Sequence, residues 1–115
     1  MDKLLKGAKT QLFISDAERD LFALKYQNNP TKELRDRLIV GSLDIVYEVV
    51  TGPEFTFSPL SGQDMLSEGI TGLIKAIDTY GTEGQIVYTQ MMISKNKVSF
   101  TEYASLAIRH AILNA

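Results

Sequence analysis

Helix-start signals constrain this chain of 115 residues more than any other feature of its sequence. In a capping box, a serine and an acidic residue three positions later each bind a backbone amide at the helix start. Three segments with apolar residues at helical spacing open this way, with the pairs Ser15 and Glu18, Ser61 and Asp64, and Ser99 and Glu102. The pattern predicts a chain built of helices.

Proline and glycine mark where these helices begin and end. Pro30 suits the first turn of a helix, where its missing N–H costs nothing, and Gly52 before Pro53 suits a left-handed cap that ends one. The predicted helices run over 15–28, 30–50, 61–80 and 99–115, with a loop over 52–62. The prediction is a small all-α bundle of about four helices over residues 15–115, after an N-terminal extension over residues 1–14.

Apolar stripes indicate which faces pack. They are carried by Leu21 and Leu24 in the first helix, Leu38 and Ile45 in the second, and Leu66, Leu73 and Ile77 in the third. Gly69 and Gly72 interrupt the third helix, and each costs about 1 kcal/mol relative to alanine. A close approach by another helix would offset that cost.

Residues 85–97 differ from the rest in composition. Gln85 to Ile93 are rich in residues typical of strands, and Ser94 to Lys97 form a polar turn candidate. We expect a short hairpin or a loop insertion here. An apolar insertion of this kind could also pair with another surface.

Composition excludes several classes of function. The chain has no cysteine and one histidine, which excludes a disulfide scaffold, thiol chemistry and the usual zinc sites. A net charge of −2 argues against binding nucleic acid by bulk charge. The sequence shows no targeting signal and no apolar run of the roughly 20 residues that span a bilayer. We therefore expect a cytoplasmic protein with no membrane contact and no cofactor.

Three segments, over residues 35–46, 64–80 and 99–112, carry more than helical periodicity. Residues 64–80 resemble the D-L-I-Q-E-G-x-x-G-L-x-x-A-x-x-x-F segment, and residues 99–112 the F-S-T-Y-A-x-x-x-I-R-x-A-I segment, of bacterial sigma factors of the housekeeping class. Upstream, residues 35–46 resemble R-x-x-L-I-x-x-N-L-x-L-V. The three matches follow the family's order and span roughly residues 16–115. The resemblance implies the fold of sigma region two.

The resemblance also implies a function in transcription initiation. In that family, the helix matching 64–80 docks on a coiled coil of the largest RNA polymerase subunit. The helix matching 99–115 contacts the non-template strand of the minus-ten promoter element and helps to melt it. The implied polymerase-binding residues are Gln63, Asp64, Ser67, Glu68 and Ile74.

The implied promoter-DNA contacts lie mostly on the last helix. Tyr103 matches a tyrosine that stacks on a flipped adenine, and we expect it to be partly exposed beside a buried Phe100. Arg109 matches an arginine on the DNA side, and His110 falls where the family often has a glutamine. The further DNA-binding candidates are Leu106, Lys95 and Lys97, although both lysines also suit a plain solvated turn.

Several departures leave alternatives open. Leu106 and Ala107 replace the family's paired tryptophans, Ser67 and Ile70 replace docking-face residues, and Glu102 is unfavourable near DNA. The DNA-reading helix of the family continues past the position of Ala115. The chain could be half of a split sigma factor completed by a second polypeptide, a phage or mobile-element variant acting in host cytoplasm, or a fragment.

Two other classes of function compete with a sigma-like factor. A sigma mimic would bind the polymerase as a regulator without reading promoter DNA, and a helical interaction module would have no tie to transcription. Catalysis has little support. Carboxylates such as Asp64 and Glu68 could serve as an acid–base pair, but no nucleophile–base arrangement, phosphate loop or metal spacing is recognisable. We do not expect an enzyme.

Overall fold

The computed structural model describes residues 13–115, and every regular element among them is a helix. The elements are α2 (Asp16–Asn28), α3 (Lys32–Gly41), α4 (Leu43–Val50), the 3₁₀ helix η1 (Pro53–Phe55), α5 (Gly62–Thr79), α6 (Glu83–Ile93) and α7 (Phe100–Leu113). No strand occurs in this part of the chain. The prediction of an all-α fold is confirmed. Residues 1–12 of the predicted N-terminal extension lie outside the described residues.

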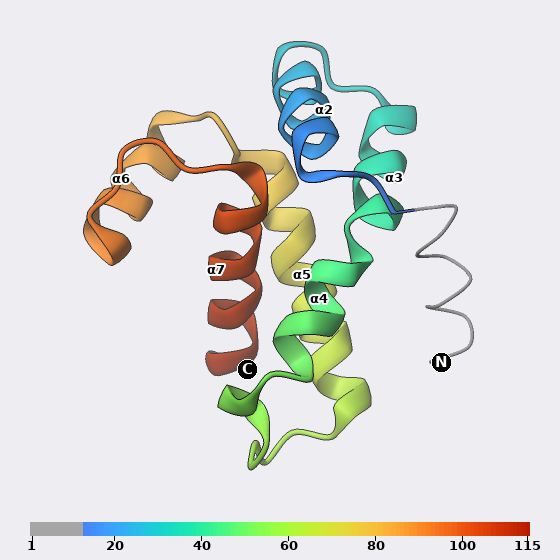
Figure 1. Ribbon diagram of the computed structural model, residues 1–115, viewed down its shortest axis with the longest axis vertical. Helices are drawn as coiled ribbons and strands as arrows, with labels where there is room; N and C mark the ends of the chain where they lie inside the picture. Colours follow the sequence, from blue (N-terminus) through green and yellow to red (C-terminus); the bar gives the residue numbers. More distant parts are fainter. Residues whose placement is uncertain (1–12) are drawn as a thin grey trace.

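The longest helix, α5, lies beside α7 at the centre of the molecule (Figure 1). Helix α4 packs against both of them, and α2 and α3 cover their other end. Helix α6 stands to one side of this body, joined to it by the chain before and after it (Figure 1). The result is a layered helical bundle with one helix outside it.

The core lies where α3, α4, α5 and α7 meet. Its fully buried side chains include Leu38, Leu73, Ile77, Phe100 and Ile108. The stripes predicted for the second and third helices therefore face the core, because their 3.6-residue period matches the packed geometry. Phe100 is buried as expected.

The stripe predicted for the first helix is wrong at its two leucines, although the aromatic residues beside them in the sequence pack against the core. Leu21 is 51% exposed and Leu24 is 48% exposed, while α2 buries Ala23 and Arg19 instead. Arg19 donates hydrogen bonds to the carbonyl oxygen of Gly41 at 3.2 Å and to Asp44 at 2.5 Å. This polar anchor fixes the rotation of α2 and turns the two leucines outward.

The helix predicted over 30–50 is broken at Ser42 into α3 and α4. The carbonyl of Gly41 accepts hydrogen bonds from the amide of Ile14 at 3.2 Å and from Arg19, neither of them a neighbour within the helix. Ile14 is buried against this junction. In a continuous helix, the carbonyl oxygen of Gly41 would accept from an amide of the same helix. Here it accepts from groups outside the helix instead, and the helix breaks at this point.

The predicted capping serines all cap helices. The hydroxyls of Ser15, Ser61 and Ser99 accept from the amides three residues on. Ser15 forms the full reciprocal box with Glu18, whereas the Glu102 carboxylate instead pairs with Lys95 at 2.8 Å.

Three predicted helix boundaries are wrong. Thr31 caps α3, so Pro30 lies before the helix rather than in its first turn. Gly52 has φ −70°, which is not left-handed, and α7 ends at Leu113 rather than running on to Ala115. Side chains and packing set these ends, so the glycine and proline signals place them only within a few residues.

The hairpin or loop expected over 85–97 is wrong, because most of this segment is the helix α6. Thr82 caps it by accepting from the amide of Gln85 at 3.2 Å. Gly81, with φ +87°, separates it from α5 directly after the predicted end of the third helix at residue 80, and Ser94, with φ 58°, ends it. The residues of this segment are common in strands, but their intrinsic preference for a strand is weak and depends on context. The cap at Thr82 therefore suffices to start a helix here.

Candidate functional site

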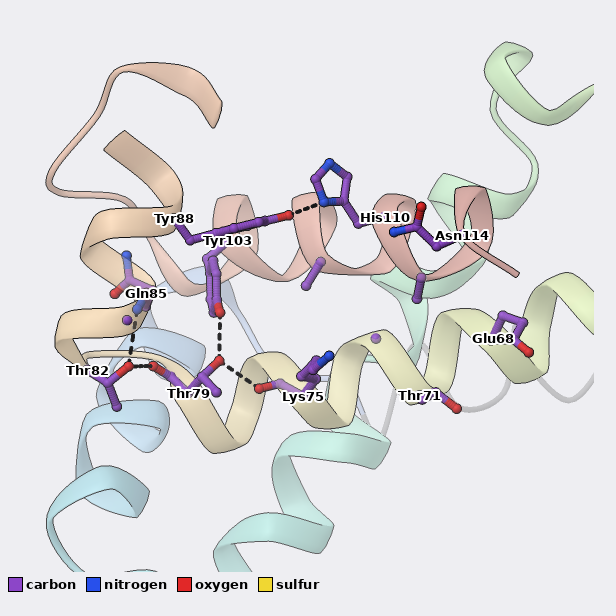
Figure 2. Close-up of a pocket in the computed structure, with 14 residues that line it drawn as sticks. Glu68, Thr71, Lys75, Thr79, Thr82, Gln85, Tyr88, Tyr103, His110 and Asn114 are labelled. Atoms are coloured by element: carbon purple, nitrogen blue, oxygen red, sulfur yellow. Dashed lines mark hydrogen bonds between the residues drawn. The ribbon is translucent and has the colours of Figure 1, made fainter. Parts of the chain in front are cut away.

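A cleft of about 510 Å³ lies between α5 and α7 and is closed at one end by α6. Glu68, Thr71, Lys75 and Thr79 line it from α5 at spacings of three and four, so they share one helix face. Tyr103, Ala107, His110 and Asn114 line it from α7 in the same way, and Gln85 and Tyr88 line it from α6 (Figure 2).

Small residues form the floor of the cleft. A Cβ atom added to Gly72 would lie 2.7 Å from the carbonyl oxygen of Ala107 and 3.0 Å from Cβ of Ala111. A Cβ on Gly69 would lie 2.7 Å from Cγ1 of Val46. The close approach predicted at both glycines is confirmed, at Gly69 by α4 and at Gly72 by α7. The approach at Gly72 brings the polar side chains of α5 and α7 to the rims of one cleft.

Two hydrogen-bonded pairs hold the closed end of the cleft (Figure 2). The hydroxyls of Tyr103 and Thr79 lie 2.6 Å apart, and Thr79 can donate to the carbonyl oxygen of Lys75 at 2.7 Å. The hydroxyl of Tyr88 bonds to Nδ1 of His110. Burial raises the pKa of Tyr88, so its hydroxyl keeps its proton at neutral pH. The tautomer of His110 decides which of the two groups donates in this bond.

The ring of Tyr88 also packs against aromatic neighbours. Its centroid is 5.4 Å from that of His110 and 6.1 Å from that of Tyr103, and both pairs are T-shaped. These contacts favour one orientation of α6 against α7. Tyr88 is half-buried, so part of it remains open to the cleft.

The predicted polymerase-binding residues are spread over two neighbouring faces of α5. Gln63, Asp64 and Ser67 are exposed, and Ile74 is half-buried. Glu68 is half-buried and lies in the lining of the cleft, where it forms no ion pair within the described residues. An exposed acidic turn therefore leads from the start of α5 into the cleft.

The predicted DNA-binding residues on α7 do not form one open surface. Tyr103 is only 6% exposed, so the expectation of a partly exposed ring is wrong. The reason is that the rings of Tyr80 and Tyr88 cover it and Thr79 binds its hydroxyl. Leu106 is also buried.

The remaining DNA-binding candidates are polar and accessible. Arg109 is exposed and forms a two-pronged ion pair with Glu54, with N–O distances of 2.9 and 2.7 Å. Half-buried His110 faces the cleft beside it. Lys95 and Lys97 lie after α6 and are exposed. Lys95 forms an ion pair with Glu102, and this pair offsets the negative charge of Glu102, which is unfavourable near DNA.

Sequence reasoning missed Tyr88 as a site residue. A hairpin over 85–97 would give its side chain no defined partner, whereas the helix α6 aims it at α7. The signal that could have found it is Thr82 followed three positions later by Gln85, a capping pattern of the same kind as the three serine boxes.

The described residues hold no group of three or more histidine or acidic side chains that could bind a metal ion. Among the same residues, no helix combines the length and apolar character needed to cross a bilayer. The fold and cleft thus define an all-α domain with a cleft at the α5–α7 contact that combines an apolar floor with polar side chains at its rims. Comparison with protein-family models and with curated protein sequences gives no match.

Proposed function

We propose that this protein is a sigma-like transcription initiation factor that binds core RNA polymerase through α5 and contacts the minus-ten element beside α7. The carrying observation is the ordered set of three sigma-like segments, two of which correspond to α5 and α7. Packing side by side, these helices bring the acidic start of one and the polar face of the other onto a single surface.

The docking part of the proposal concerns the acidic turn of α5. Asp64 and Glu68 are one helical turn apart, so their carboxylates can meet basic residues on a partner helix. Asp64 is exposed and neither carboxylate has an ion-pair partner within residues 13–115. We infer that the partner is the coiled coil of the largest polymerase subunit.

In the DNA part of the proposal, the residue that stacks on a flipped base is Tyr88 rather than Tyr103. A flipped base needs an accessible aromatic face and polar groups for its edge. The half-buried ring of Tyr88 lies at the cleft with His110 and Lys75, whereas the ring of Tyr103 is covered. Binding on the polymerase would supply phosphate neutralisation that a chain of net charge −2 lacks.

The first test is capture of core RNA polymerase by the purified chain. We expect the wild type to bind and the double variant Asp64→Lys/Glu68→Lys to lose at least tenfold in affinity, because two attractive carboxylates become repulsive cations. Glu33→Lys/Glu48→Lys is the matched control, since it makes the same charge change at exposed positions of α3 and α4. Absence of binding by the folded wild type, or equal loss in the control, would contradict the docking proposal.

A regulator that occupies the polymerase without reading promoter DNA is the second candidate. The observation that favours it is the burial of Tyr103 and Leu106 together with the pairing of Arg109 to Glu54. These features leave α7 with few free side chains for DNA.

A labelled minus-ten non-template strand separates the two candidates. For an initiation factor, the polymerase complex binds the strand and Tyr88→Ala weakens binding severalfold without changing polymerase capture. For a regulator, the complex adds no strand binding over polymerase alone. The variant Phe57→Ala, which removes a 95% exposed ring outside the lining of the cleft, serves as the control for loss of an aromatic residue.

A further inference from the structure

A flap formed by residues 82–97 covers the closed end of the cleft. It consists of α6 and the turn that follows it (Figure 1). Just outside the flap on either side, the Tyr80 hydroxyl donates to the carbonyl oxygen of Val98 at 2.8 Å. The chain is thus fastened both before and after the flap, so the flap can move without separating the segments that carry it.

The backbone at both ends of α6 is suited to bending. Gly81, which precedes the flap, has φ +87°, a conformation that glycine adopts freely and other residues rarely adopt. Ser94 ends α6 with φ 58°, and residues 94–99 form no regular element. Hinges are typically a few loop or element-terminal positions of this kind. Gly81 and the turn after Ser94 are therefore hinge positions about which α6 can turn as one body.

The inner face of α6 is polar and makes its hydrogen bonds within the helix. Gln85 is buried and donates to the hydroxyl of buried Thr89 at 3.2 Å. The Thr89 hydroxyl can donate in turn to the carbonyl oxygen of Gln85 at 3.0 Å. These bonds survive a movement of the whole helix. Most apolar residues of α6 already face solvent, so opening the flap loses little apolar burial; they are Ile86, Val87, Met91 and Met92.

Two side-chain bonds tie the flap to α7 in the part of the chain that the structure describes. The hydroxyl of Tyr88 bonds to Nδ1 of His110, and Nζ of Lys95 lies 2.8 Å from a carboxylate oxygen of Glu102. The second pair is exposed, and exposed ion pairs contribute little because water and salt screen them. These fastenings are weak enough to open while the body stays folded.

We propose that residues 82–97 form a gate that opens about Gly81 and the turn after α6 and uncovers the ring of Tyr103. In the closed arrangement, the rings of Tyr88 and Tyr103 meet edge to face with their centroids 6.1 Å apart, which leaves no room for a planar ligand between them. Opening admits such a ligand, and closing brings the ring of Tyr88 onto it. The identity of the ligand as a flipped DNA base rests on the proposed function, whereas the movement does not.

Chemical modification of tyrosine in the full chain tests the movement. N-acetylimidazole acetylates accessible tyrosine hydroxyls, and peptide mass spectrometry reports Tyr103 and Tyr80 separately. Tyr88→Phe removes one fastening but keeps the ring, and Lys95→Glu turns the other into a repulsion. We expect each variant to raise the acetylation rate of Tyr103 severalfold and to leave that of Tyr80 unchanged, because Val98 binds the Tyr80 hydroxyl outside the flap. No increase at Tyr103, or an equal increase at Tyr80, would overturn the proposal.

Two further variants control the charge change. Lys97→Glu makes the same reversal at an exposed lysine of the same turn, which forms no ion pair within residues 13–115, and it should leave the rate at Tyr103 unchanged. Lys95→Glu/Glu102→Lys restores the ion pair with its charges exchanged and should return the rate toward that of the wild type. An increase in Lys97→Glu equal to that in Lys95→Glu, or a double variant faster than Lys95→Glu, would overturn the proposal.

A reversible lock connects the gate to strand binding. The chain has no cysteine, so Lys95→Cys/Glu102→Cys can be joined specifically by a bismaleimide that contains a reducible disulfide. In the polymerase complex, we expect the locked chain to bind the labelled minus-ten non-template strand at least tenfold more slowly than the same chain after reduction of the linker. Equal rates would overturn the gate. Absence of strand binding by the wild type would contradict the proposed function instead, and the acetylation of Tyr103 would still decide whether the flap opens.

Discussion

At the scale of single residues, two glycines decide how closely the central helices approach. Gly72 is buried where α5 meets the backbone of α7, and its missing side chain lets the two helices touch. The cost of glycine within a helix is offset by packing that no larger residue would allow. The cleft depends on this contact, because its rims are the flanks of α5 and α7.

Gly72→Ala tests this contact. The added Cβ would meet the Ala107 carbonyl oxygen at 2.7 Å, and a backbone atom can move only if the helices separate. We expect the free energy of unfolding to fall by about 1–3 kcal/mol, a typical cost of overpacking. Chemical denaturation measures it.

Gly62→Ala is the control for the same substitution. Position 62 is the first residue of α5, and no atom lies within 4 Å of an added Cβ. We expect no loss of stability and a gain of up to about 1 kcal/mol, because alanine restricts the unfolded chain. Equal destabilisation by both substitutions would show that helix contact is not the cause.

At the scale of elements, an ion pair links the segment around η1 to α7. Glu54 lies in η1, and Arg109 binds both of its carboxylate oxygens. The hydrogen bond from Arg109 holds the pKa of Glu54 below its ordinary value of 4.5. Because this pKa is lowered by folding, the pair stabilises the folded state fully above that ordinary value.

The stabilisation should fade as pH falls from about 5 through the lowered pKa of Glu54, since protonation removes the carboxylate charge. Glu54→Gln should be less stable than the wild type at pH 7 by at most about 1 kcal/mol, because both side chains are exposed. The difference should shrink as the pH falls through the lowered pKa of Glu54. Thermal unfolding of both proteins from pH 7 into the acid range measures it, and a difference that does not change with pH would contradict an electrostatic origin.

At the scale of the whole molecule, α6 lies outside the packed body. The buried apolar core cluster draws on α2, α3, α4, α5, α7 and the segments between them, and α6 adds only the half-buried Tyr88 at its margin. The segments just before and just after α6 contact each other without any residue of α6. The Tyr80 hydroxyl donates to the carbonyl oxygen of Val98 at 2.8 Å, and the rings of Tyr80 and Phe100 are 5.5 Å apart.

Replacing residues 83–96 with a short glycine–serine linker should therefore leave a folded body. We expect a single cooperative thermal transition with Tm lowered by several degrees, because Tyr103 becomes more exposed when Tyr88 is removed. Circular dichroism follows the transition. Loss of cooperative unfolding would show that α6 is part of the folding unit and not an addition to it.

Much of the helical framework could be predicted from sequence. The serine caps at Ser15, Ser61 and Ser99 are local, since each hydroxyl binds an amide three residues away. Helix α6 was not predicted, because the strand-forming residues that follow its N-cap, Thr82, indicate a strand. The candidate site was predicted only in part, because Tyr88 reaches it through helix α6, where the composition predicts a hairpin or a loop.

The sequence by itself determined where most helices begin and that α5 needs a close neighbour at Gly69 and Gly72. These properties depend on contacts within one or two helical turns. Only the tertiary structure decided that Arg19 turns α2 around, that Tyr103 is covered and that α6 shows its apolar side to solvent. Those outcomes depend on residues 20 or more positions apart in the chain, such as Arg19 with Asp44 and Tyr88 with His110, whose meeting no local pattern encodes.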